Sequence, residues 1–226
     1  MVSHETLHAN LESVRVNIAA AAARAGRSPD AVRLVAVTKG QPLEAIEGLY
    51  ALGVRHFGEN RIAEGQKKAT ALAANTDIHW HMIAPVSVGD TLGLAKYFHY
   101  LHALTSTRAA ARLNEFSSYR GAPFPVLLEF NVSGEASKGG WPADDPAMWP
   151  TLVPMVAELA ALPFVDVRGL MTMAPYSPDS EDARPVFARL RELRDFLNAE
   201  RPELALRELS MGMSGDYAVA VEEGAT

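Results

Sequence analysis

The sequence predicts an α/β fold, a (β/α)8 TIM-type barrel preceded by one extra helix, with a single domain over residues 1–226. Short apolar runs alternate with amphipathic stretches from residue 33 onward, which is typical of parallel βαβ units. The repeats are evenly spaced, and no Gly-x-Gly-x-x-Gly motif follows an apolar run. Both features count against the alternative architecture, a doubly wound open sheet.

The extra helix is expected first, over residues 3–25. Ser3 can cap it, its apolar residues from Leu7 to Ile18 recur every three or four positions, and a glycine ends it. Apolar runs then predict strands at 33–38, 54–58, 78–83, 99–104, 126–131, 165–171 and 206–211. Amphipathic stretches predict helices at 43–52, 61–74, 88–97, 107–119, 145–161, 181–200 and 215–223. Because the sequence stops at Thr226, we expect the eighth strand to be missing or truncated in this chain.

Composition narrows the classes of function. Apolar residues make up 48% and charged residues 21% of the chain, ordinary values for a globular protein with a sizeable core. There is no cysteine, which excludes disulfides, thiolate metal sites and cysteine nucleophiles. The net charge of -6 does not favour nucleic acid as a partner. Neither a signal-peptide core nor a bilayer-spanning stretch is present, so we expect a cytoplasmic protein without membrane contact.

Lys39 is the most informative polar residue. It follows the first predicted strand in "LVAVTKGQP" (34–42), and the loops after the C-terminal ends of barrel strands build the functional site. An amine held against apolar walls loses hydration, which leaves more of it as the neutral nucleophile that forms a Schiff base with an aldehyde. The alternative is a strand-end lysine whose stem packs and whose charged end reaches water.

The segment "LSMGMSGD" (209–216) predicts an anion site after the seventh strand. Ser210 and Ser214 offer hydroxyl groups. Gly212 and Gly215 let backbone N–H groups approach a ligand, and glycine-rich turns and helix starts bind phosphate. The alternative is a helix-capping segment with Ser214 as the N-cap. A lysine and a phosphate cradle on one barrel rim favour an aldehyde that also carries a phosphate.

Other polar residues allow two interpretations each. Asn60 either hydrogen-bonds a ligand or caps the helix that starts near Arg61. His79 and His81 share one face of a strand and could begin a metal site, but core or rim histidines are the favoured interpretation and no metal is predicted. Residues 137–139 form either a loop that closes over a ligand or a solvated turn.

Six segments occur in this order: "LVAVTKGQP", "HFGEN", "HWHMI", "SKGG", "RGLMTM" and "LSMGMSGD". Together they resemble the pyridoxal phosphate homeostasis protein family over nearly the whole chain, and the fold of that family is like the N-terminal barrel of alanine racemase. The resemblance implies that Lys39 carries pyridoxal 5'-phosphate (PLP) as an internal aldimine, with Asn60 and His81 near its ring. It also implies that the phosphate is held by Ser210, Met211, Gly212, Met213 and Ser214.

The resemblance implies a role in vitamin B6 and amino-acid homeostasis, without robust catalysis. The residues agree, because a racemase of this barrel type needs a second acid/base opposite the lysine. In alanine racemase a tyrosine from a second domain and another subunit supplies it. This sequence ends before such a domain could begin, so we expect a monomer. The alternatives are a PLP-dependent racemase or Schiff-base lyase of low activity, and a barrel that binds other phosphates without covalent chemistry.

The sequence departs from the family pattern at three places. In "TKGQP", Gln41 replaces the second cation of the family's Ser-Lys-Thr-Lys-Pro. In the loop at 84–90, the family's Gln, Asn and Lys become Ser87, Gly89 and Asp90, with a reversed charge at the last position. Relatives continue past the final Gly-Ala-Thr with a strand of the form Val-Arg-Ile-Gly, whose arginine faces the pyridine nitrogen. Without that strand, cofactor affinity should be weak.

Overall fold

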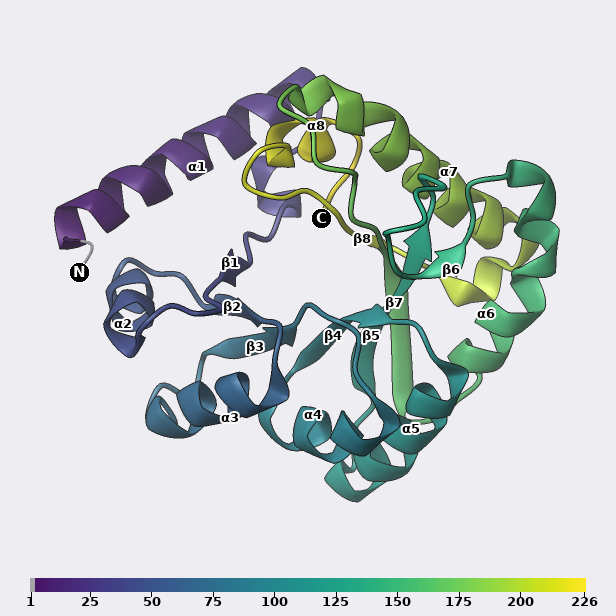
Figure 1. The fold of residues 1–226 in the computed structure, drawn as a ribbon, viewed down its shortest axis with the longest axis horizontal. Helices are drawn as coiled ribbons and strands as arrows, with labels where there is room; N and C mark the ends of the chain where they lie inside the picture. Colours follow the sequence, from purple (N-terminus) through teal and green to yellow (C-terminus); the bar gives the residue numbers. More distant parts are fainter. Residues whose placement is uncertain (1–2) are drawn as a thin grey trace.

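One curved sheet carries parallel strands in the order β1-β2-β3-β4-β5-β7-β8, with the short β6 attached only to β5 (Figure 1). This computed structural model describes residues 3–226. The strands are β1 (Ala36–Val37), β2 (His56–Glu59), β3 (His79–Met82), β4 (Tyr100–Leu104), β5 (Phe124–Asn131), β6 (Trp141–Pro142), β7 (Val165–Met171) and β8 (Glu208–Ser210). The predicted α/β fold is confirmed, and its sheet is an open half-barrel.

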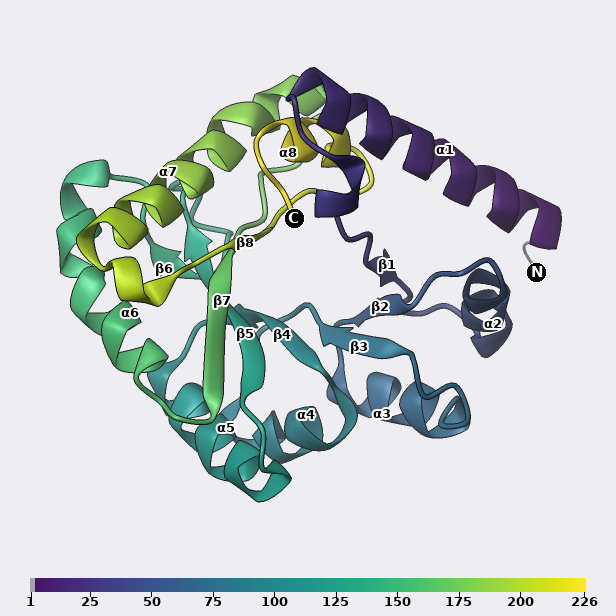
Figure 2. The ribbon, with the colours of Figure 1, turned by 180° about the vertical axis from the view of Figure 1, so that it is seen from behind.

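Helices cover the outer side of the sheet, as Figures 1 and 2 show from opposite directions. They are α1 (His4–Arg24), α2 (Leu43–Ala51), α3 (Ile62–Ala71), α4 (Thr91–Tyr97), α5 (Thr107–Arg120), α6 (Val153–Ala160), α7 (Arg184–Glu200) and α8 (Tyr217–Glu222). The short 3₁₀ helices are η1 (Pro29–Ala31), η2 (Val88–Asp90), η3 (Pro146–Thr151), η4 (Ser180–Ala183) and η5 (Pro202–Leu204). Ser3 caps α1 as predicted. Within residues 3–226, no helix has the length and apolar character needed to cross a membrane.

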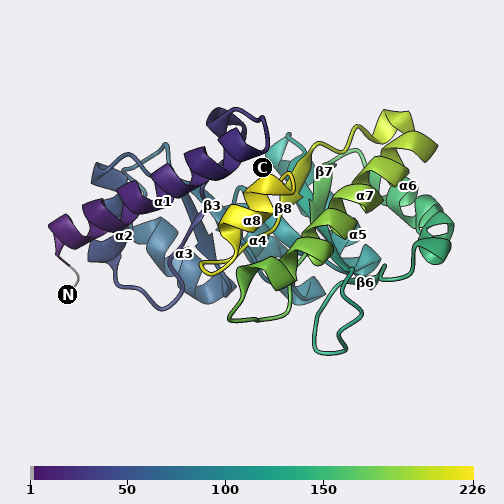
Figure 3. The ribbon, with the colours of Figure 1, turned by 90° about the horizontal axis from the view of Figure 1, so that it is seen from above.

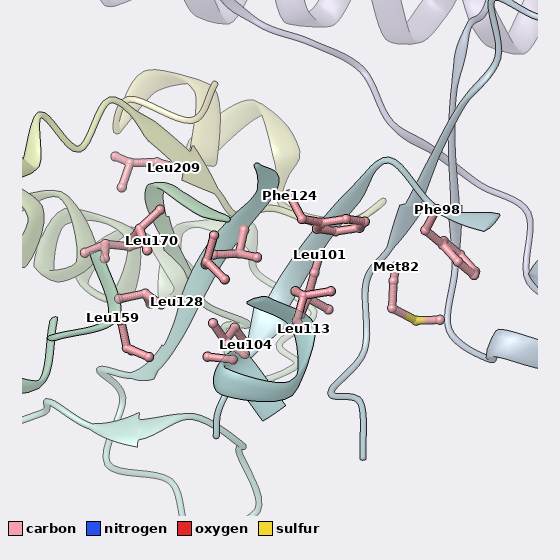
Figure 4. Packing of buried hydrophobic residues seen from close by; sticks show 14 of the residues in the cluster. Met82, Phe98, Leu101, Leu104, Leu113, Phe124, Leu128, Leu159, Leu170 and Leu209 are labelled. Atoms are coloured by element: carbon pink, nitrogen blue, oxygen red, sulfur yellow. The ribbon is translucent and has the colours of Figure 1, made fainter. Parts of the chain in front are cut away.

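The main hydrophobic core lies between the sheet and these helices. Leu128 and Phe130 of β5 are fully buried in it, and Leu113 of α5 and Leu159 of α6 pack into the same cluster (Figure 4). Each such side chain contributes about 1.5–3 kcal/mol through burial. Because side chains alternate along a strand, Leu127, which directly precedes Leu128, belongs to a separate small cluster on the concave side. The core therefore decides which strand residues face the concave interior.

β1 and β8 form the two edges of the curved sheet, and no ladder joins them within the part of the chain that the structure describes. Thr226 lies between these edges. Its N–H donates to Leu209 O (3.0 Å), and its carbonyl accepts from Arg33 N–H (2.6 Å). The expected barrel is thus open where the sequence analysis placed the missing eighth strand.

Three elements differ from the sequence-based expectation. The first strand shrinks from 33–38 to two residues, because it lies at an edge and pairs only with β2. The segment 141–142 forms β6, since its backbone pairs with the end of β5. The expected helix at 145–161 divides into η3 and α6, because Pro150 lacks the N–H that a continuous helix requires.

Candidate functional site

Lys39 lies in a tight turn directly after β1. Thr38 N–H donates to Gly58 O of β2 (2.9 Å), which carries the pairing one residue past β1. Gln41 N–H then bonds back to Thr38 O (2.9 Å), and Gly40 takes the left-handed φ of 70° that the turn requires. Lys39 itself is exposed. The expectation of an amine held against apolar walls is therefore wrong in this structure.

A largely buried ion network anchors this turn. Lys68 Nζ of α3 donates to Glu59 Oε1 (2.8 Å) and Glu64 Oε1 (2.6 Å). It also donates to the Thr38 carbonyl (2.7 Å), and the Thr38 hydroxyl donates to Glu59 (2.6 Å). The bond from Lys68, together with one from Gly40 N–H (2.7 Å), lowers the pKa of Glu64. Sequence analysis missed this network, although the i,i+4 spacing of Glu64 and Lys68 was an available signal.

Asn60 lies beside the Lys39 turn, because it follows β2 and β2 pairs in parallel with β1. The next helix, α3, begins at Ile62 with Arg61 at the N-cap position, and no side chain caps it. The capping interpretation of Asn60 is therefore wrong. Its side chain makes no hydrogen bond within residues 3–226 and is partly exposed, so its amide is free for a ligand.

The segment 210–216 forms a glycine-rich turn at the end of β8. Gly212 has a φ of 95°, and a Cβ there would lie 2.8 Å from the Cβ of Ala220, so only glycine lets the turn pass this close to α8. In the described chain, no acceptor bonds to the N–H groups of Gly212, Ser214 and Gly215. Ser214 and Gly215 are neighbours, and free N–H groups of successive residues are an arrangement that binds anions.

One donor of this turn is already engaged. Met213 N–H donates to the buried carboxylate of Asp216, and α8 begins one residue later. The N-cap of α8 is Asp216, so the interpretation of Ser214 as a helix cap is wrong. The exposed hydroxyl of Ser214 is thus available to a ligand, whereas Met213 N–H is available only if Asp216 releases it.

These residues fall into two groups at the C-terminal edge of the sheet. Figure 3 shows the loops after β5, β7 and β8 on one side of the molecule. Because the strands are parallel, the turns after β1 and β2 belong to the same edge. Lys39 and Asn60 therefore lie at one end of the curved sheet, and Ser210 with its turn lies at the other.

A histidine chain, formed by His56, His81 and His102, crosses the concave side toward Ser210. His56 Nδ1 lies 2.9 Å from His81 Nε2, and His81 Nδ1 lies 2.8 Å from His102 Nε2. His102 Nδ1 lies 2.7 Å from Ser210 Oγ. Burial is the main cause that lowers the pKa of His56 and of His102 to about 4, and it lowers that of His81 still further. All three rings are therefore neutral at pH 7.

The histidine chain bears on two sequence-based interpretations. His81, which the resemblance places near a ligand ring, is buried and uses both of its nitrogens within the chain. Sequence analysis missed His56 and His102, although histidines on three successive predicted strands were a signal. Among residues 3–226, no group of three or more histidine and carboxylate side chains is arranged to hold a metal ion.

The loop 132–140 is braced against β5. The Asn131 side chain bonds to the backbone of several loop residues, and Gly139 packs against Glu129, where an added Cβ would lie 3.0 Å from Oε1. Glu129 is buried, its Oε2 has no partner in the part of the chain that is described, and burial raises its pKa. Residues 137–139 are thus a fixed turn beside a carboxyl group that sequence analysis did not single out.

Residues 9–224 match the family described as alanine racemase, N-terminal domain. The chain is 38% identical over 222 residues to the pyridoxal phosphate homeostasis protein of Pseudomonas aeruginosa, covering 98% of this chain and 91% of that protein. It is 34% identical over 219 residues to the protein of the same name in Escherichia coli K12, covering 96% and 90%. The chain belongs to the pyridoxal phosphate homeostasis protein family.

Solved structures place this pyridoxal phosphate homeostasis family member among similar folds. PipY of Synechococcus elongatus PCC7942, solved with PLP bound, has a TM-score of 0.78 at 34% identity and covers 92% of this chain and 95% of that one. An alanine racemase of Clostridium difficile 630 has a TM-score of 0.67 at 15% identity, covering 96% of this chain and 52% of that one. At that identity the likeness concerns the fold alone.

Proposed function

We propose that this chain is a PLP-binding protein of vitamin B6 and amino-acid homeostasis that holds the cofactor as a Schiff base on Lys39 and lacks robust catalysis. One observation carries the proposal. An exposed amine follows the C-terminal end of β1, a turn with free N–H groups follows the C-terminal end of β8, and these strand ends lie on the same side of one parallel sheet. PipY, which is 34% identical, was solved with PLP bound, and the curated relatives carry PLP homeostasis in their names.

The residues present suit the parts of PLP. The Lys39 amine is a nucleophile for the aldehyde, with one water lost as the bond forms. The N–H groups of Gly212 and Ser214, the Ser214 hydroxyl and the backbone at Met211 suit the phosphate, and Met213 N–H would join them once Asp216 releases it. The free amide of Asn60 suits a polar ring substituent beside the Lys39 turn.

The wider assignments follow the same proposal. The half-barrel corresponds to a (β/α)8 barrel whose missing strand would lie between β8 and β1, where Thr226 bonds to Leu209 of β8 and to Arg33, three residues before β1. The protein works as a monomer, and its net charge of -6 does not attract nucleic acid. Light scattering of the purified protein, with and without PLP, measures its molar mass in solution and so tests whether it is a monomer.

Trapping of the cofactor tests the proposal. PLP added to the purified protein should produce visible absorption, and borohydride should then fix the cofactor on Lys39, as located by mass mapping of peptides. Lys39→Ala should abolish both signals, because the nucleophile is removed. Lys138→Ala, which changes a lysine of the braced loop, is the matched control and should leave both signals unchanged. Modification at Lys138 in the unaltered protein would refute the site.

The alternative is a racemase or Schiff-base lyase of low activity. Buried Glu129 favours it, because burial raises the pKa of this carboxyl and a protonated carboxyl group is a potential general acid. Amino-acid turnover by PLP-loaded protein, measured against Lys39→Ala, separates the two functions. Turnover that depends on Lys39 would favour the enzyme, and cofactor trapping without turnover would favour the homeostasis role.

A further inference from the structure

The histidine chain joins two different environments. At one end His102 bonds to Ser210, a proposed phosphate ligand. At the other end His56 lines a cavity of about 550 Å³ together with three arginines and Asp30. Arg15 and Arg55 are paired with Glu12 and Asp77, so Arg33 is the cation of this lining that has no carboxylate partner within residues 3–226. Apart from its bond to His81, the His56 ring makes no hydrogen bond within those residues, so its Nε2 is available to the cavity.

The proton positions along the histidine chain are linked to one another. A neutral imidazole has one N–H and one lone pair, so it donates from one nitrogen and accepts at the other. Each nitrogen–nitrogen bond of the chain needs one donor and one acceptor. Either all three rings carry the proton on Nδ1 and donate toward Ser210, or all three carry it on Nε2 and donate toward the cavity.

These two arrangements have opposite effects on Ser210. With protons on Nδ1, His102 donates to Ser210 Oγ, and the hydroxyl proton remains free for an anion. With protons on Nε2, the hydroxyl must donate to His102 and presents only lone pairs, which repel an anion. At the far end, the Nδ1–H arrangement leaves the lone pair of His56 on Nε2, in a ring that lines the same cavity as Arg33 and feels its positive charge. An anion at one end and a cation at the other therefore favour the same arrangement.

The groups around the chain keep its rings neutral, which a linked set of tautomers requires. Arg33 opposes protonation of all three rings, and His79 stacks on His56 with ring centroids 4.8 Å apart. Tyr100 stacks on His81 at 5.2 Å, and its hydroxyl bonds to Glu208 rather than to the chain. Arg168 lies over the Tyr100 ring, with its Cζ 5.5 Å from the ring centroid.

We infer that the histidine chain positions the phosphate of PLP: as three Nδ1–H tautomers, it makes the Ser210 hydroxyl a hydrogen-bond donor to that phosphate. The three histidines are positioning residues, because they act through Ser210. The inference rests on the proposed function, since the anion is the phosphate of PLP bound on Lys39.

Spectra of the ring nitrogens test this directly. In protein labelled with [15N]histidine, long-range 1H–15N correlations distinguish Nδ1–H from Nε2–H tautomers, and His→Leu variants assign the signals. With PLP bound at neutral pH, all three rings should be Nδ1–H. An Nε2–H or doubly protonated ring in the chain, with cofactor trapped on Lys39, would overturn the inference and leave the proposed function standing. Failure to trap PLP on Lys39 would overturn both.

A matched pair of variants tests the chain from its far end. His56→Leu removes the first donor without touching a proposed ligand contact. It should weaken PLP binding by up to about tenfold, because His81 Nε2 then lacks the donor that holds the remaining rings as Nδ1–H tautomers. His79→Leu changes the stacked neighbour outside the chain and should leave the affinity unchanged. Equal affinities for the two variants would overturn the inference.

A second pair serves if loss of His56 impairs folding. His102→Asn keeps an N–H close to the position of Nδ1 and should retain most of the PLP affinity. His102→Leu removes that donor and should weaken binding about tenfold. A merely structural role for His102 predicts that both variants lose affinity alike, and that result would also overturn the inference.

Discussion

At the residue scale, the location of Lys39 depends on side chains that no ligand needs to touch. The turn is held by Lys68, which joins the carboxylates of Glu59 and Glu64 to the Thr38 carbonyl. The side chains of Lys68 and Glu59 are 8% and 0% exposed. Removing one partner of such a pair leaves a buried charge without compensation, which costs far more than the pair itself contributes.

We therefore expect Lys68→Met to lower the free energy of unfolding by about 3–5 kcal/mol, the range for a broken buried pair. Lys67→Met, an exposed neighbour on the same helix, should change it by less than about 0.5 kcal/mol. Urea denaturation of both variants measures the difference. Because Lys68 holds the turn that carries Lys39, Lys68→Met should also reduce cofactor trapping on Lys39. Similar unfolding midpoints for the two variants would contradict the network's role.

The sequence predicts site residues whose chemistry is local, but not those whose role depends on partners far away in the chain. Lys39 and the turn at 210–214 stand directly after apolar runs, so their place at strand ends could be predicted. His102 and Ser210 lie 108 positions apart and meet only because the sheet curves. The burial of Lys68 was equally unpredictable, since charged residues on amphipathic helices are usually exposed.

At the element scale, β8 is held against β7 by an approach that only glycine permits. Gly169 pairs with Glu208, and an added Cβ at Gly169 would lie 1.8 Å from the Glu208 carbonyl oxygen. Since β8 is only three residues long, it has few other hydrogen bonds to the sheet. The location of Ser210 and its turn therefore depends on this contact.

Gly169→Ala should force β8 away from β7 and destabilise the protein by about 1–3 kcal/mol or more, as overpacking does. Gly89→Ala is the matched control, because its nearest neighbour would be Ser87 Oγ at 3.7 Å, an ordinary contact. Only Gly169→Ala should lower the midpoint of the urea denaturation curve and reduce the amount of PLP trapped. A Gly169→Ala protein as stable as the control would show that the two strands can separate at little cost.

Helices and strands could be predicted where the apolar periodicity extends over many residues. The prediction failed where pairing with a neighbouring strand decides whether a segment forms a strand. The helix α7 and the strands β5 and β7 carry enough periodic apolar residues to be recognised. By contrast, β6 has two residues and exists only because β5 offers it a free backbone edge. The shortening of β1 has the same origin, since an edge strand keeps only the pairing that its one neighbour supplies.

At the scale of the whole molecule, polar contacts tie together strands that are far apart in the sheet. His102 of β4 bonds to Ser210 of β8, and Tyr100 of β4 bonds to Glu208 of β8. β5 and β7 lie between β4 and β8 in the strand order, so these bonds cross the concave side. The open half-barrel is therefore braced internally by bonds to titratable groups, so its stability depends on their protonation.

This bracing predicts a specific pH dependence of stability. The pKa of His102 is lowered from 6.5 to about 4 in the folded protein. At pH values between these two, His102 is protonated in the unfolded protein and neutral in the folded protein. Stability should fall as the pH drops through this window, by up to about 1.4 kcal/mol per pH unit for a fully buried group. His56 acts in the same direction with a smaller effect, because it is only half-buried.

Urea midpoints measured from neutral pH down to pH 5 test this dependence. Buried Glu129 acts in the opposite direction, because a carboxyl group whose pKa is raised in the folded protein gains stability as the pH falls through that pKa. The histidine contribution is therefore measured as the difference between the unaltered protein and a histidine variant. Glu64 and Glu222 have lowered pKa values, so their contribution is present above their ordinary value of 4.5 and is lost only below it. His102→Asn should reduce the slope of the profile without abolishing it, because the substituted residue binds no proton in either state whereas His56 and His81 still have lowered pKa values. His8→Gln, on the exposed face of α1, should leave the profile unchanged. A midpoint that stays constant over this range in the unaltered protein would mean that the three histidines are protonated in the folded protein without loss of stability. A neutral set of linked histidines could not then brace the sheet.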